Sequence, residues 1–198
     1  MPRTKDHTLS ALDALVGDLY AATVDGVRDQ LDQYPDTGHT HRTTTKRSIT
    51  RDHIVDRLRS KLDGNSNIRI EDDNQTTYFH LFSEYKMLVK KSDEVGAVQL
   101  SKTQASFDFQ KNEAQLHLDT SVFPDVTNLY LGYIPNESDP RNPSVVLICP
   151  RKDGINWMHE LEPPAAFIAG EIGSSKPVGS VEEEELVRVP SVKKAKPE

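Results

Sequence analysis

Hydrophobic and polar residues alternate along residues 78–91, a pattern that predicts one long β-strand in the middle of the chain. One face of this strand carries the apolar side chains, and the other face is mixed and charged. The apolar face consists of Phe79, Leu81, Tyr85, Met87 and Val89. Such a strand suits an antiparallel sheet with one face against a core. Because about 14 residues exceed the usual strand length of about 5–6, we expect a bend or bulge near Ser83.

Apolar residues at steps of three and four predict a first amphipathic helix from about Ser10 to Gln33. Thr8 or Ser10 is a candidate N-cap, and Asp13 completes a pattern that resembles a capping box. Pro35 is expected to end the helix. The apolar stripe includes Leu12, Leu15, Val16, Leu19, Tyr20, Val24 and Val27.

A second helix is expected to begin at Thr50 and to end at Gly64. Its narrow apolar stripe consists of Ile54, Val55, Leu58 and Leu62. Residues 36–48, between the two helices, contain almost no apolar side chain and are interpreted as an exposed linker.

Strands are predicted at residues 68–71 and 76–82, joined by an acidic turn. Residues 100–112 are ambiguous: Phe107 and Phe109 alternate as in a strand, whereas Ser101 could cap a helix, which is the interpretation that we favour. Residues 115–119 are expected to be extended.

The clearest β segment runs from residue 128 to residue 162. It predicts an antiparallel meander, because it contains two apolar stretches, a loop rich in Pro, Asn and Asp, a turn at residues 150–154 and a final strand. Trp157 is its largest side chain, and we expect it to pack in the same core as the long strand.

These elements predict an α+β fold in which N-terminal helices are followed by an antiparallel β-sheet and a disordered C-terminal tail. We divide the chain into a helical region (residues 1–63, with the linker 36–48), an antiparallel β-rich domain (64–162) and a tail (163–198). The tail combines prolines with blocks of Glu and Lys, so it buries too little apolar surface to fold. Two short apolar islands within it could become ordered on a partner.

Composition narrows the possible environments and partners. The chain has 198 residues, of which 35% are hydrophobic, and a net charge of −7; its mean hydropathy is −0.61 and its pI is about 5.5. An acidic protein does not bind nucleic acid through its bulk charge. Cys149 has no second cysteine to pair with and fits a reducing compartment. With no signal-peptide pattern and no run of membrane-spanning length, we expect a cytoplasmic protein.

The first candidate chemistry is a metal-dependent nuclease of the PD-(D/E)xK type. Asp72 or Asp73 is followed by a strand and then by Glu84 and Lys86, which share a strand face. In such an enzyme two carboxylates hold Mg²⁺ and a lysine neutralises developing charge. The same spacing is common by chance, so a half-exposed strand with a cross-strand charge pattern is the favoured interpretation.

The second candidate is a winged-helix-like DNA-binding regulator, because a basic helix precedes a β-hairpin. Residues 39–63 hold seven basic and three acidic residues, a local charge of +4. The candidate contacts are Arg47, Arg51, Arg57, Arg59 and Lys61. On a helical wheel, however, the apolar stripe separates the basic residues into two ridges. We therefore expect DNA binding that is weak and is lost with modest added salt.

No metal site and no cofactor are predicted. His39 and His41 are close in sequence but lie in the linker. His159 and Glu160 begin like a zinc-protease motif, yet the position of the second histidine is Pro163.

The second half of the chain resembles a group of uncharacterised bacterial proteins. The residues that carry the resemblance are Phe79-His80-Leu81-Phe82, Leu88–Lys91, Thr127-Asn128-Leu129, Gly132-Tyr133, Cys149-Pro150, Trp157 and Glu160-Leu161. Members of this group are encoded beside proteins with a helix-turn-helix and an ImmA/IrrE-type metallopeptidase domain. The resemblance spans residues 78–162 and implies a role in a toxin–antitoxin-like or stress-response pair.

We therefore expect a non-catalytic protein–protein interaction or regulatory component. Its expected partner is another protein, such as the product of a neighbouring gene, with nucleic-acid binding weak or absent and no membrane association.

Overall fold

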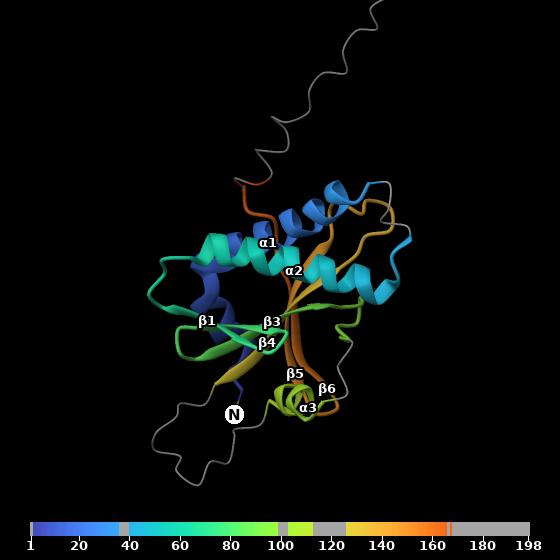
Figure 1. Cartoon of the computed structure of the whole chain (residues 1–198). Helices are drawn as coiled ribbons and strands as arrows, with labels where there is room; N and C mark the ends of the chain where they lie inside the picture. The colour runs from blue at the N-terminus through green and yellow to red at the C-terminus, as the bar shows by residue number, and fades with distance from the viewer. Residues whose placement is uncertain (1, 36–39, 99–102, 113–125, 166, 168–198) are drawn as a thin grey trace, which may run out of the picture.

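The computed structural model describes residues 2–35, 40–98, 103–112, 126–165 and 167. It confirms the α+β fold, with two long helices at the start of the chain and a six-stranded sheet after them (Figure 1). The elements are α1 (Lys5–Gln33), α2 (Thr43–Leu62), β1 (Ile68–Asp73), β2 (Thr76–Leu81), β3 (Tyr85–Lys91), α3 (Gln104–Lys111), β4 (Thr127–Ile134), β5 (Ser144–Arg151) and β6 (Gly154–Glu160).

The sheet is mixed, which corrects the prediction of a wholly antiparallel sheet. Its strands lie in sequence order from β1 to β6, and neighbouring strands are antiparallel except for β3 and β4, which are parallel. The parallel register runs from Tyr85 opposite Thr127 to Lys91 opposite Tyr133. Parallel neighbours require a long crossover connection, and the chain between β3 and β4 contains α3. The predicted meander of β4, β5 and β6 is confirmed.

The single long strand predicted for residues 78–91 is wrong, because the chain reverses there and forms the β2–β3 hairpin. Phe82 and Ser83 both adopt positive φ angles, of 53° and 58°, and the amide of Glu84 donates to the carbonyl of Leu81. The reversal falls where we expected a bend. Since Leu81 lies directly opposite Tyr85, the same side chains still share one face. All five predicted core residues, Phe79, Leu81, Tyr85, Met87 and Val89, are accordingly buried.

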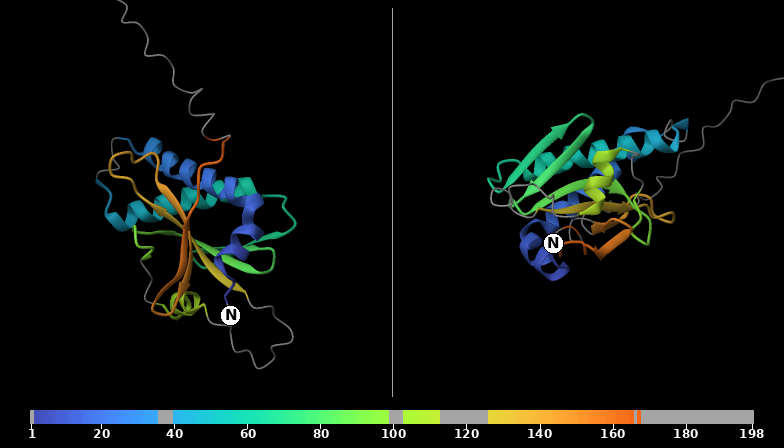
Figure 2. Two further views of the ribbon diagram at one scale, coloured as in Figure 1. Left: turned by 180° about the vertical axis from the view of Figure 1, so that it is seen from behind. Right: turned by 90° about the horizontal axis from the view of Figure 1, so that it is seen from below.

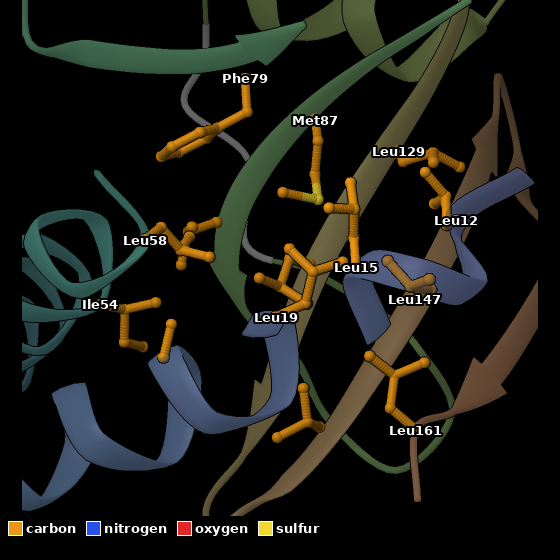
Figure 3. Packing of buried hydrophobic residues seen from close by; sticks show 14 of the residues in the cluster. Leu12, Leu15, Leu19, Ile54, Leu58, Phe79, Met87, Leu129, Leu147 and Leu161 are labelled. Carbon is orange, nitrogen blue, oxygen red and sulfur yellow. The ribbon is translucent and has the colours of Figure 1, made fainter. Parts of the chain in front are cut away.

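The main core lies between the sheet and the two long helices (Figure 3). Leu12, Leu15 and Leu19 come from α1 and Ile54 and Leu58 from α2; they pack against sheet residues such as Phe79, Met87, Leu129 and Leu147. α1 and α2 also approach each other closely. A Cβ atom added at Gly26 would lie 2.6 Å from the backbone of Ile54, so this crossing requires glycine.

The opposite face of the sheet carries a second, smaller core under α3. It consists of Tyr78, Leu88, Phe109, Tyr130, Val146 and Ile148. Figures 1 and 2 show α1 and α2 on one side of the sheet and α3 on the other. Trp157 packs against the main core as expected, but it is half-buried at the rim, where its indole N–H donates to the carbonyl of Arg3 at 3.3 Å.

The helices begin at different residues from those predicted. α1 is capped by Thr4, whose hydroxyl oxygen accepts from the amide of His7, and Thr8 lies inside the helix. α2 begins at Thr43, so residues 43–48 of the expected linker are helical, and Thr50 is buried within the helix. Threonine has a low helix propensity, so the three threonines at residues 43–45 did not predict the start of a helix.

The ambiguous stretch at residues 100–112 contains helix α3, capped by Thr103; the alternative cap, Ser101, lies outside the described residues. Residues 115–119 and 168–198 also lie outside them. The tail was expected to start at residue 163, yet Phe167 packs edge-on against Tyr20 and under the guanidinium of Arg28. Within the described part of the chain, no helix has the length and apolarity to cross a membrane.

Candidate functional site

A polar cleft of about 710 Å³ opens between the middle of α2, the β1–β2 turn, strands β2, β3 and β4 and the start of α3. We call it the β3 cleft and define it by Arg51, Thr76, Tyr78, Lys90, Thr103 and Ser106, which line it together with Asp73 and an apolar floor. The volume is in the range of small-molecule sites, roughly 300–1,000 Å³. In Figure 1 the start of α2 and the end of β3 lie at the same side of the molecule.

Two cations, Lys90 and Arg51, face the cleft. Burial lowers the pKa of Lys90, and the nearby charge of Arg51 lowers it further. No ion pair of Lys90 with a carboxylate occurs among the described residues, whereas Arg51 pairs with exposed Asp52 at 2.8 Å. Such a surface pair contributes only about 0–1 kcal/mol and yields readily to a competing anion. Two neighbouring cations of this kind are stabilised when an anion lies between them.

The start of α3 adds uncharged donors on the opposite wall. Thr103 caps the helix: its hydroxyl oxygen accepts from the amide of Ser106 at 3.3 Å, and its hydroxyl donates to the Ser106 hydroxyl at 3.0 Å. The first turn of α3 contains no acidic residue. The positive end of the helix dipole therefore adds to the potential of Lys90 and Arg51, an arrangement that favours anions.

The floor of the cleft is apolar and well packed. Phe109 lies between Tyr78 and Tyr130, with ring centroids 6.1 Å and 5.1 Å apart respectively, and Leu88 completes the surface. Burial raises the pKa of Tyr78 and that of Tyr130, so both hydroxyls stay protonated at neutral pH. The cleft thus offers cations, hydroxyl donors and an apolar base, a set suited to holding a phosphate or carboxylate group.

The four residues of the nuclease hypothesis do not converge. Asp72 pairs with Arg59 and accepts from the Thr77 hydroxyl, contacts that lower its pKa; Asp73 lines the β3 cleft. Glu84 lies at the other end of β2, about 20 Å away for six residues of strand. There it pairs with Arg3 at 3.2 Å. The Lys86 ammonium, in contrast, lies 3.7 Å above the ring of Tyr78, which lines the β3 cleft. The part of the chain that the structure describes contains no group of three His, Cys, Asp or Glu side chains placed to hold a metal ion.

The five basic residues predicted as DNA contacts divide into two sets. Arg57 forms a two-pronged pair with Asp29 at 2.6 and 2.8 Å, which lowers the pKa of that carboxyl, and Arg59 pairs with Asp72. Lys61 is exposed.

Arg47 and Arg51, in contrast, face the end of β3. Arg47 lies close enough to Lys91, and Arg51 close enough to Lys90, to lower the pKa of each lysine, which burial already lowers.

Sequence reasoning missed Lys90, Lys91, Thr103 and Ser106 as site residues. The two lysines were visible as a charged end to an apolar strand, LVKK, and that pattern could have marked them. Thr103 and Ser106 gave no such signal, because their role depends on α3 beginning beside β2 and β3.

Comparisons with protein-family models, curated proteins and solved structures find no match for this chain. The pairing with a partner protein in a toxin–antitoxin-like or stress-response system stays a prediction.

Proposed function

We propose that this protein is a non-catalytic regulatory component that recognises a phosphate-bearing ligand in the β3 cleft. The observation that carries the proposal is the placement of Lys90 and Arg51 together in a partly buried cleft, with no carboxylate paired to Lys90 among the described residues. Burying like charges costs free energy unless an opposite charge or hydrogen bonds compensate. A phosphate would supply both.

The chemistry of the lining supports binding rather than turnover. Metal-assisted phosphate hydrolysis uses several carboxylates to hold the ion, and Asp73 is the single carboxylate among the described lining residues. The tyrosines of the floor are held protonated, which disfavours them as nucleophiles. No histidine lies among the described lining residues to activate Thr103 or Ser106, and the hydroxyl of Thr103 donates to that of Ser106.

The test is a titration of the ¹⁵N-labelled full chain with inorganic phosphate and with pyrophosphate, followed by NMR. We expect amide shifts at Arg51, Lys90 and Thr103–Ser106. Lys90→Met should weaken binding about tenfold, the loss expected for one hydrogen bond to a charged group. The matched control is Lys61→Met, which removes an exposed lysine from the last turn of α2, outside the cleft lining. Equal binding by both variants, or conversion of pyrophosphate to phosphate by the protein, would contradict the proposal.

A further inference from the structure

A second pair of cations continues from the β3 cleft around the end of strand β3. Lys91 follows Lys90 and so projects from the opposite face of the sheet, and Arg47 precedes Arg51 by about one turn of α2. Burial lowers the pKa of Lys91, and the charge of Arg47 lowers it further. The Nε–H of Arg47 is buried and has no hydrogen-bond acceptor among the described residues. Buried donors normally have partners, so this group suits an anionic acceptor from a ligand.

The two arginines face the same end of the sheet. Burial raises the pKa of Tyr133, opposite Lys91 in β4, to about 12, while Thr50, Arg47 and Arg51 act in the opposite direction. Lys90 with Arg51 and Lys91 with Arg47 therefore form two adjacent cation pairs, which we call the cation track.

Cations gather in the N-terminal half of α2, where the two arginines of the cation track lie. The first turn of α2 contains no acidic residue; Arg42 is the N-cap of the helix, and Lys46, Arg47 and Arg51 lie in its first half. Arg42 and Lys46, at the N-cap and in the first turn, oppose the helix dipole, whereas Arg47 and Arg51 lie beyond the first turn, where this effect is small. Farther along the helix, Arg57 and Arg59 are neutralised by Asp29 and Asp72. A protein of net charge −7 thus carries a cluster of cations in the N-terminal half of α2, among which Arg51 pairs with the exposed Asp52.

We infer that the cation track and the β3 cleft form one binding surface for a single-stranded nucleic acid, with successive phosphates at the two cation pairs. This inference rests on the proposed function and names the class of its ligand. Arg47 and Arg51 are about 6 Å apart along the helix axis, one to two nucleotides of a stacked strand at about 3.4 Å each. A single phosphate would use one pair, whereas a polyanion uses both.

The surroundings favour a single strand over a duplex. A cleft of about 710 Å³ with an apolar floor accommodates one or a few nucleotides. α2 packs its Ile54, Leu58 and Leu62 face into the core and so does not project as a groove-binding helix.

Lys91 also lines a second hollow, of about 900 Å³, together with Asp93, Glu94, Glu137 and Glu160. These carboxylates repel phosphate. The strand therefore follows α2 away from this hollow, towards Arg42.

The experiment is fluorescence anisotropy of fluorescein-labelled oligo(dT) and oligo(rU) of twelve nucleotides, titrated with the full chain at several KCl concentrations. For a single strand the slope of log K against log salt is about −0.7 per phosphate neutralised. We therefore expect about −3 for four cations, and about −1.4 for Arg47→Gln/Lys91→Gln with at least tenfold weaker binding. The matched control is Lys61→Gln, which removes an exposed cation from the other end of α2.

The outcomes separate this inference from the function on which it rests. In one outcome, phosphate still shifts the amide resonances of the β3 cleft while the salt dependence of oligonucleotide binding is the same in wild type and in Arg47→Gln/Lys91→Gln. That result would refute the inference about the cation track and leave the proposed phosphate site in the β3 cleft supported. Equal losses for Lys61→Gln, or tighter binding of duplex than of single strand, would also overturn the inference. If neither phosphate nor oligonucleotide binds, both proposals fail. Thermal unfolding checks that each variant is folded. If the double variant does not fold, Arg47→Gln alone, at a partly exposed site, should reduce the salt-dependence slope by about half as much.

Discussion

Replacing Lys90 with methionine should stabilise the protein, although it removes a charged side chain from the proposed binding site. Lys90 is partly buried beside Arg51, and no ion pair of its ammonium group occurs among the described residues. Methionine has similar length, keeps the apolar contacts and removes both the desolvation penalty and the repulsion. Exchanging buried ionic groups for apolar ones often gains 1–4 kcal/mol, and we expect about 1 kcal/mol here because the site is partly open.

The effect is measurable as a rise in Tm. For a chain of this size, about 1 kcal/mol corresponds to roughly 2–4 °C. Lys86→Met is the matched control and should have the opposite sign, because it removes the ammonium that lies 3.7 Å above the Tyr78 ring. A cation–π contact of this kind is worth about 0.5–1 kcal/mol at an exposed site.

The pH dependence follows from the direction of the pKa shift. The folded protein holds the proton of Lys90 less tightly than the unfolded chain, whose lysines titrate near 10.5. The charged Lys90 therefore lowers the free energy of unfolding by its full amount at neutral pH. This destabilisation disappears as pH rises from the lowered pKa of Lys90 in the folded protein towards 10.5. The advantage of Lys90→Met should be largest at neutral pH and shrink towards pH 10.5. A loss of stability in Lys90→Met, or a difference that does not change with pH, would refute this reasoning.

Three further substitutions test the packing. Gly26→Ala should cost about 1–3 kcal/mol in urea unfolding, since its Cβ would lie 2.6 Å from the Ile54 backbone, and a neutral effect would show that the helices can separate. Trp157→Ala should cost less than the 3–5 kcal/mol of a fully buried aromatic residue, because its ring is half-buried and bonded to the Arg3 carbonyl; a cost in that range would place it deeper. Asn112→Ala should lower the free energy of unfolding by about 2–4 kcal/mol, because the buried amide serves several backbone groups of β4 and β5, and Asn112→Asp should fail to restore it.

Periodicity predicted the buried face correctly even where it gave the wrong element. Odd-numbered residues from Phe79 to Val89, except Ser83 in the turn, lie in the main core although the chain reverses at Phe82 and Ser83. A three-residue connection preserves the parity of the two strands, so the pattern of burial is the same for a long strand and for this hairpin. Phe and Ser are not the Asn and Gly residues that usually mark such turns, which is why the reversal left no sequence signal.

Local sequence patterns could not predict which strands and which charged side chains pair across the fold. The parallel arrangement of β3 and β4 depends on the crossover through α3, and helix α3 was ambiguous in sequence. The basic residues of α2 all look alike in the sequence, yet Asp29 and Asp72 neutralise two of them from outside the helix. Which cations remain available is therefore a property of the folded chain.

The most direct test of the binding site is a crystal structure of the full chain grown with a short oligo(dT) at moderate salt. The proposals place a phosphate within hydrogen-bonding distance of Lys90 Nζ and the Arg51 guanidinium, and the next phosphate near Arg47 and Lys91. An oligonucleotide bound instead along Arg57, Arg59 and Lys61, with the β3 cleft free of phosphate, would contradict them.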